Sequence, residues 1–402
     1  MASRKALSEL YRPVGPKAIQ TGIPWASGGQ FTLNQAVDLS LPIRGIRIVF
    51  RGRNVIGGAD YASTTPEGYL NLISNITIQG TNARQKGNLT LWNVDMATAW
   101  VYAHMFSNRA GQFTLNNQTV GIPDTPFPPV GAGIAGGFGG TIGYVNGAQA
   151  TYDWRIVLDL PFHLHGSQVF GNANLTVPGF LVRNEEWKDS LQIALTFGTV
   201  TNGAVAGALG TGQAATTNTF SQFGAAGGSP VIDLYSLPMV MGLDQKDSVL
   251  PGVLSRVTQP INTILQAAGN NVVLANLQKQ PTPRVLLKVG VATVANVFTA
   301  LSDVNVTTLG ILLGGNRNVR NVVDIFAHKQ QQPDVYQRDP IQGYNLMDFE
   351  DSGNPDSAYP GQDIGDGATF QLVGNVAGVA NAQGIVLQEQ MLHMPTGPLY
   401  TF

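Results

Sequence analysis

Cysteine is absent from this 402-residue chain. Its absence excludes disulfide bonds, thiol nucleophiles and metal sites built on cysteine. Charged residues are scarce as well, at 12% of the chain, whereas soluble domains contain about 25%. The 23 basic and 25 acidic side chains give a formal net charge of -2. Because nucleic-acid binding proteins show a basic excess, we predict no direct sequence-specific contact with nucleic acid.

Long apolar runs and a secretory signal are also missing. The first twelve residues contain no apolar segment of the kind that defines a signal peptide. The longest apolar stretch, residues 285–301, contains Lys288 and Asn296 and is typical of strands rather than of a membrane helix. We therefore expect synthesis and folding in the cytoplasm.

The scarcity of charged residues also bears on whether the chain assembles. A soluble monomer normally needs a charged surface, whereas the centres of protein interfaces are depleted in lysine and glutamate. The composition therefore favours a chain that buries much of its surface in stable assembly. The alternative is a β protein rich in glycine, alanine, asparagine and threonine that neutral polar groups keep in solution.

The residues that are present indicate strands separated by turns. Short apolar and β-branched segments alternate with clusters of glycine, asparagine and proline, as in an antiparallel sandwich. Residues 1–28 differ, because three prolines prevent a long helix and the basic side chains outnumber the one acidic side chain, Glu9. We predict an N-terminal arm over this segment, with the basic residues Arg4, Lys5, Arg12 and Lys17.

Two segments have helical periodicity, and their surroundings repeat. One helix is expected from a cap at Asn93 through Asn108, and a second from a cap at Asn318 through Ala327. They contain the related triplets Tyr102-Ala103-His104 and Phe326-Ala327-His328, and three strand signals follow each. The repeated order predicts an internal duplication, with Gly-rich insertions at 109–150 and 199–229 in the first copy.

Two β modules, a helix in each, and large loops in one of them resemble the double jelly-roll major capsid proteins of tailless icosahedral viruses, the lineage of adenovirus hexon and the membrane-containing phages. The closing segments 343–349, 368–373 and 384–392 also resemble the ends of such coat proteins. The resemblance implies an all-β fold of two tandem jelly rolls, each an eight-stranded β-sandwich with one short helix and long inserted loops. The expected domains are 29–245 and 246–402.

The same resemblance implies a structural role in a virion. Three copies would form a pseudo-hexameric homotrimer, and trimers would tile an icosahedral shell made in the host cytoplasm. The expected partners are neighbouring capsomers and minor capsid or vertex proteins. The two insertions would form outward towers, and the arm would reach an internal viral membrane through Arg4, Lys5, Arg12 and Lys17. A disordered tail is the alternative for the arm.

Candidate chemistry is weak elsewhere, and we predict no enzyme, no cofactor and no firm metal site. His163 and His165 lie two residues apart, so one face of a strand would carry both imidazoles and could begin a zinc or copper site. An ordinary strand-end or interface pair is the alternative. An acidic region that includes Asp351 and Asp356 could hold Ca²⁺, or it could be a solvated loop without EF-hand spacing.

Nucleotide and hydrolase motifs are not supported. Residues 131–136 match G-x-G-x-x-G, but prolines precede the match and glycines follow it, so the strand and helix of a dinucleotide site are missing. Nucleophile elbow, P-loop and zinc-protease motifs are absent from the sequence. The remaining alternatives to a coat subunit are a carbohydrate-binding or attachment β-sandwich and an enzyme acting on polysaccharide.

Overall fold

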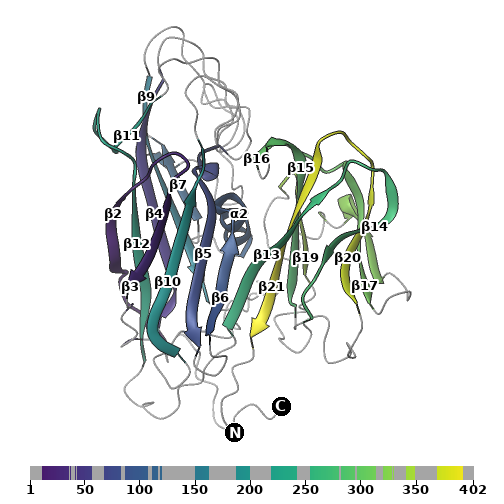
Figure 1. Ribbon diagram of the computed structural model, residues 1–402, viewed down its shortest axis with the longest axis horizontal. Coiled ribbons are helices and arrows are strands. Elements are labelled where there is room, and N and C mark those ends of the chain that lie inside the picture. The colour runs from purple at the N-terminus through teal and green to yellow at the C-terminus, as the bar shows by residue number, and fades with distance from the viewer. Residues whose placement is uncertain are drawn as a thin grey trace.

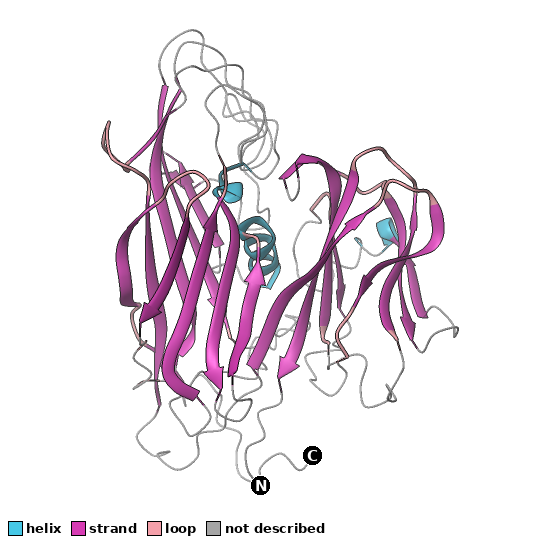
Figure 2. Cartoon of the chain, in the orientation of Figure 1, coloured by secondary structure: helices cyan, strands magenta, loops and turns pink. Residues whose placement is uncertain are grey.

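A computed structural model describes the strand framework of the chain. The residues described are 11–35, 37, 41, 43–56, 68–82, 87–106, 111–115, 118–119, 150–162, 187–199, 219–241, 254–279, 282–294, 297–313, 320–327, 329, 341–348 and 369–392. Figure 1 shows two β modules side by side, with their long strands running in the same general direction. Strands dominate both modules, and the helices are small elements beside them (Figure 2).

The first module is a sandwich of two sheets. Its principal strands are β2 (Lys17–Pro24), β3 (Gln30–Gln35), β4 (Ile43–Ile56), β5 (Ile73–Asn82), β6 (Gly87–Val94), β9 (Ala150–Pro161), β10 (Trp187–Phe197) and β12 (Val231–Met241). One sheet has the order β2-β12-β4-β9, and the other has the order β3-β10-β5-β6. The additional elements are β1 (Tyr11–Pro13), β7 (Gly111–Leu115), β8 (Gln118–Thr119), β11 (Thr219–Ser221), the 3-10 helix η1 (Gly68–Leu72) and the helix α2 (Met96–Phe106).

The second module is smaller and has the same plan. Its principal strands are β13 (Leu254–Ile264), β14 (Gly269–Asn276), β15 (Arg284–Val294), β17 (Val306–Leu313), β18 (Arg320–Asp324), β19 (Tyr344–Asp348), β20 (Phe370–Val376) and β21 (Ala382–Leu392). Its sheets have the orders β13-β21-β15-β19 and β14-β20-β17-β18. The short strand β16 (Val297–Leu301) pairs with β15.

The connectivity of the two modules is identical. If the principal strands of each module are numbered one to eight along the chain, both modules contain one sheet of order 1-8-3-6 and one of order 2-7-4-5. This is the arrangement of a jelly roll, in which two Greek keys fold into facing sheets. The predicted all-β fold of two tandem eight-stranded jelly rolls is therefore confirmed.

Alternation of side chains explains why these segments form sandwich strands. On β4, Ile46, Ile48 and Phe50 are fully buried, whereas Arg47 and Arg51 lie on the opposite face. Successive strand residues point to opposite faces of the sheet, so the arginines that interrupt the apolar run in the sequence face away from the core. Antiparallel pairing with β9 and β12 fixes this register.

The two helices begin later than the sequence pattern predicts. Strand β6 continues to Val94, and Asp95 rather than Asn93 caps α2 by accepting a 2.7 Å hydrogen bond from the Thr98 amide. In the second module the predicted helical segment begins as strand β18, which pairs with β17. Residues 325–327 and 329 form a short helix, which we call the short helix of the second module. The β-branched residues of β18 fit a strand better than a helix.

The N-terminal segment also differs from the expected arm. Residues 11–13 and 17–24 are the strands β1 and β2, and both pair with β12. The physical reason is backbone pairing: this segment supplies the first strand of the first jelly roll, which its 1-8-3-6 sheet needs as an edge. Residues 1–10 lie outside the described part of the chain.

Candidate assembly surfaces

A parallel strand pair joins the two modules. Val257 of β13 lies beside Trp92 of β6, and Thr258 lies beside Asn93. This pairing connects the 2-7-4-5 sheet of the first module to the 1-8-3-6 sheet of the second, so a single nine-stranded sheet runs through both. We call the contact region around β6, α2 and the second module's sheet the joint.

Apolar packing closes the joint. On β15, Leu286 points toward the first module and Leu287 points into the interior of the second. On β21, Leu387 likewise points toward the first module and Val386 into the second. The core cluster of the first module therefore continues across the joint, and a separate cluster fills the second module. As a result, β15, β19 and β21 of the 1-8-3-6 sheet are buried on both faces over most of their length.

Buried charges lie within this apolar contact. The Arg284 guanidinium is 3.0 Å from the Glu389 carboxylate, and both side chains are almost fully buried. The hydroxyl of Tyr102, on α2, donates a short hydrogen bond to the same carboxylate. Since α2 belongs to the first module and β15 and β21 belong to the second, these contacts fix one module against the other. Buried charges are tolerated in such a place only when they are paired.

The cap of α2 makes a second polar contact at the joint. Asp95 accepts hydrogen bonds from the amide and the hydroxyl of Thr98, both at 2.7 Å. Its carboxylate is also 3.8 Å from the ammonium of Lys288, which is fully buried and lies 4.6 Å from the centre of the Phe298 ring. One carboxylate therefore starts the helix and balances a buried cation of the other module.

The short helix of the second module occupies the corresponding place in its own jelly roll, between the fifth and sixth strands. Asp324 caps it by accepting hydrogen bonds from the amides of Phe326 and Ala327, at 2.9 and 3.3 Å. The Phe326 side chain is 59% exposed, whereas Tyr102 in the related triplet of α2 is fully buried. The two modules thus present the same element in opposite environments.

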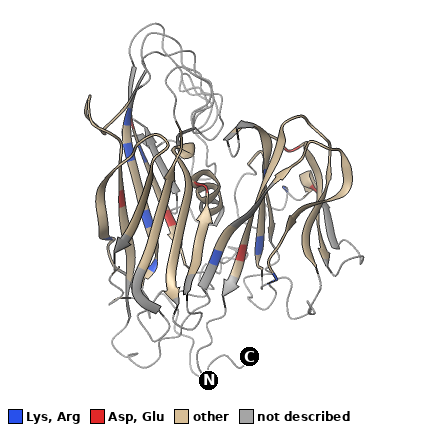
Figure 3. Ribbon diagram, in the orientation of Figure 1, with Lys and Arg blue, Asp and Glu red and all other residues tan. Residues whose placement is uncertain are grey.

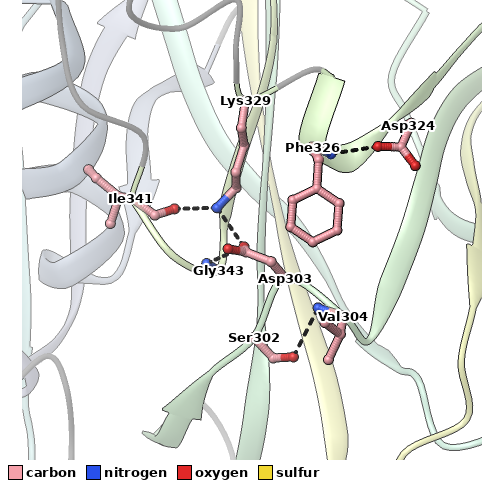
Figure 4. Close-up of polar contacts among 8 residues, drawn as sticks. All are labelled: Ser302, Asp303, Val304, Asp324, Phe326, Lys329, Ile341 and Gly343. Carbon is pink, nitrogen blue, oxygen red and sulfur yellow. Dashed lines mark hydrogen bonds and ion pairs between the residues drawn. The ribbon is translucent and has the colours of Figure 1, made fainter.

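A partly buried ion pair holds the short helix in place (Figure 4). The Lys329 ammonium lies 2.5 Å from Asp303 and donates a 2.6 Å hydrogen bond to the carbonyl of Ile341. Asp303 also accepts a hydrogen bond from the amide of Gly343, whose φ of 77° suits glycine. Burial lowers the pKa of Lys329, and the hydrogen bond to Asp303 opposes that shift. Val304, next to Asp303, is 60% exposed.

The first module presents a half-exposed, charged face. Opposite its core, the β2-β12-β4-β9 sheet carries ion pairs between Arg47 and Asp159 and between Arg51 and Asp233, at 2.6 and 3.1 Å. Val49 lies between the two arginines on the same face of β4. Figure 3 shows that charged residues on the described ribbon are few and that several of them lie on these strands.

A third ion pair lies farther along this face. Arg53 and Asp153 are 2.7 Å apart, and both side chains are about one-fifth exposed. The hydrogen bonds from Arg53 lower the pKa of Asp153, and the amide of Gly224 adds to the effect. Gly224 belongs to the second predicted insertion, so this pair ties the described end of that insertion to the sheet.

Two of the predicted site residues lie in described strands of the first module. Arg12 lies in β1 and Lys17 begins β2, where the Lys17 carbonyl accepts a 3.3 Å hydrogen bond from Ser236. Both residues therefore belong to strands that pair with β12 in the first module. The other candidates lie outside the described residues: Arg4, Lys5, His163, His165, Asp351 and Asp356.

The described residues form neither a metal-binding cluster nor a membrane-spanning helix. Among the described residues, no group of three or more histidine, aspartate or glutamate side chains is placed to hold a metal ion. Within that part, no helix has the length and apolar character that crossing a membrane requires.

The sequence does not identify the residues that build the joint. Arg284 and Glu389 have the ordinary appearance of charged residues near strand ends. Lys288 carries one available signal, because it is a cation inside an apolar stretch, and such a residue needs a buried partner if the stretch is core. Its partner, Asp95, lies nearly two hundred residues away, and no local pattern links them.

Comparison with known proteins identifies the fold but no sequence family. No protein-family model matches the chain, and no curated protein matches it either. Solved structures do match, including "Crystal Structure of the STIV MCP", with a TM-score of 0.53 and 14% identity over 94% of this chain and 95% of that chain. The class of protein that the fold defines is therefore the double jelly-roll protein.

Two further structures support this assignment. The atomic structure of Sulfolobus Turreted Icosahedral Virus matches with a TM-score of 0.54 and 14% identity, over 96% of this chain and 90% of that chain. PBCV-1 VP54, fitted into a reconstruction of the virophage Sputnik, matches with a TM-score of 0.51 and 10% identity, over 95% and 93%. The resemblance to double jelly-roll major capsid proteins is confirmed at the level of fold, over nearly the whole chain.

Proposed function

We propose that this chain is a structural major capsid protein, which forms pseudo-hexameric homotrimers that tile an icosahedral shell. The observation that carries the proposal is the pair of jelly rolls with identical connectivity, fused side by side by one nine-stranded sheet. Three such chains contain six similar modules and can form a ring of near-sixfold outline. The fold shared with viral coat proteins supports the same role.

The surface composition supports assembly. Only 12% of the residues are charged, and many of the described charged side chains are paired or buried. Such a surface avoids precipitation when specific contacts with further copies cover it. The proposed partners are therefore further copies of the chain and neighbouring capsomers, together with minor capsid or vertex proteins. The protein would be found in the virion after synthesis in the host cytoplasm.

The two ends of the first module support an orientation of the subunit in the shell, with one end facing outward and the other inward. Ala150, at the end of the first insertion, pairs with Ile56, and Thr219, in the second insertion, pairs with Val55, both beyond the point on β4 where its pairing with β12 begins. Strand β1 pairs with the opposite end of β12 at residues 239–241. We propose that the insertions 109–150 and 199–229 are outward towers. The segment before β1, with Arg4 and Lys5, would then reach inward toward an internal membrane.

Native mass spectrometry and electron microscopy of the purified chain test this function. We expect particles of three copies with three-lobed outlines, or closed shells made from them. A protein that remains a monomer at micromolar concentration, with no larger particles, would contradict the proposal. Binding of a monomer to glycans on an array would instead favour the attachment-protein alternative.

A further inference from the structure

The joint within one chain provides a template for contacts between chains. Its donor side is the fifth strand, β6, with the helix α2 that follows it. Its receiving side is the outer face of the 1-8-3-6 sheet of the next module, where Leu286 and Leu387 are buried and Glu389 accepts the Tyr102 hydroxyl. The donor side and the receiving side are each made by strands with a fixed place in the jelly roll. Because both modules have the same connectivity, each side has a counterpart in the other module.

The donor side recurs, without its partner, in the second module. The fifth strand there is β18, and the short helix that follows it carries Phe326. Tyr102 and Phe326 begin the same aromatic-Ala-His triplet, yet the first is fully buried and the second is 59% exposed. Phe326 and Val304 lie beside the Lys329–Asp303 ion pair, so two exposed apolar side chains stand next to a short helix that this pair holds in place (Figure 4).

The receiving side recurs in the first module. The outer face of its 1-8-3-6 sheet is the half-exposed surface of β2, β12, β4 and β9, which carries Val49, Val157 and Tyr235 between the ion pairs. At the joint Tyr102 contacts Glu389 of the eighth strand, which in turn pairs with Arg284 of the third strand. The counterparts of these two strands here are β12 and β4.

We propose that the short helix of the second module, with Phe326 at its centre, docks on this outer face of the first module of a second copy. The occupant is a second copy because only the first module of this chain repeats the surface that the joint already uses. The inference rests on the proposed function and adds to it the two faces that meet. The contact is head-to-tail, and such contacts close into a ring when the rotation allows.

Charge on the described residues agrees with this pairing. Asp324 is exposed at the start of the short helix, while Asp303 is neutralised by Lys329. On the receiving face three arginines are paired with three aspartates, and Arg155 is an additional exposed cation. The donor side thus brings an additional acidic group toward a face with an additional basic one.

A substitution at Phe326 tests the donor side. Phe326→Ser removes an exposed aromatic ring and leaves the Asp303–Lys329 pair unchanged, so we expect a folded protein with the far-ultraviolet circular dichroism spectrum of the original chain. Native mass spectrometry should show at least a tenfold loss of trimer in favour of monomer. The matched control is Ile264→Ser, because Ile264 is 75% exposed at the end of β13 and takes no part in the proposed contact.

Covalent capture tests both sides together and does not depend on the substitution weakening the trimer. Because the chain lacks cysteine, a Phe326→Cys, Val49→Cys variant contains only the two introduced thiols. A flexible bismaleimide should convert it into covalent dimers and trimers on a denaturing gel. The control Phe326→Cys, Ile264→Cys should give at least tenfold less of both.

The outcomes separate this inference from the proposed function. If the original chain is a trimer, but Phe326→Ser stays trimeric and the two cysteine variants crosslink equally, the docking surface is wrong and the capsid role stands. If the original chain is monomeric, the proposed function is wrong, and the docking surface that rests on it is wrong as well. Loss of trimer only in Phe326→Ser, with crosslinking only in the Val49 variant, supports the docking surface.

Discussion

Glu389 has surroundings that come from both modules. Its carboxylate is buried with the Arg284 guanidinium, and it accepts the hydroxyl of Tyr102 from across the joint. Neither interaction could be predicted from the sequence, because the three residues are far apart in the chain and each has the local pattern of its own strand or helix. What local alternation does predict is which side of a strand each residue occupies.

Glu389→Gln should therefore be strongly destabilising. The substitution leaves Arg284 buried without a carboxylate, and removing one member of a buried pair costs about 3–5 kcal/mol. Urea denaturation should show this loss in the free energy of unfolding. Arg53→Gln is the control, since its ion pair lies at the surface and its removal should have a much smaller effect. Equal effects of the two substitutions would contradict the role of the buried pair.

Lys329 predicts a pH dependence at the residue scale. Burial lowers its pKa in the folded chain below the ordinary 10.5, so the unfolded chain binds more protons between the two values. Stability attributable to Lys329 must then rise as the pH increases through this interval, because the cost of burying the charge disappears.

The measurement is a comparison of the original chain with Lys329→Met. The free energy of unfolding of the original chain, relative to the variant, should increase as the pH is raised toward 10.5 through the lowered pKa of Lys329. A difference that stays constant, or that falls over this interval, would show that the ammonium is not held at a lowered pKa.

Helix boundaries show what the sequence predicts at the scale of elements. Periodicity identifies a helix between the fifth and sixth strands of the first module, and the structure contains α2 there. The predicted start at Asn93 is wrong because β6 remains paired through Asn93 and Val94. Strand pairing with distant residues decides such boundaries, and a helical pattern in one segment contains no information about it.

Asp95 allows the cap and the charge to be separated. Asp95→Asn keeps an oxygen that accepts the Thr98 amide but removes the charge beside Lys288, whereas Asp95→Ala removes both. We expect Asp95→Ala to be less stable than Asp95→Asn by about 1 kcal/mol, the usual contribution of a helix cap. Chemical denaturation of both variants measures the difference, and equal stabilities would mean that the side chain does not cap α2.

At the scale of the whole molecule, duplication is visible in the sequence but the joint is not. The related triplets and the repeated strand order predict two similar modules, because each module must repeat its own local patterns. The parallel contact of β6 with β13 involves only two residue pairs, and an edge contact of that kind has no composition signal. Low charge favours assembly, but it does not predict which faces meet.

The shared core predicts that the two modules unfold together. All five tryptophans lie in the first module, so tryptophan fluorescence reports that module alone, whereas far-ultraviolet circular dichroism reports both. Because the core cluster continues across the joint, the two denaturation curves should coincide. A circular dichroism transition that is complete at a different denaturant concentration from the fluorescence transition would mean that the modules unfold separately.

The continuous nine-stranded sheet has a mechanical consequence. Hydrogen-bonded strands with apolar packing on both sides behave as a plate, and the described part of the joint consists of paired strands and packed side chains. The shell that we propose for this chain would therefore take up its curvature at the seams between molecules. Variants that alter the size of the shell should accordingly map to those seams, and the interior of each plate should tolerate little change of angle.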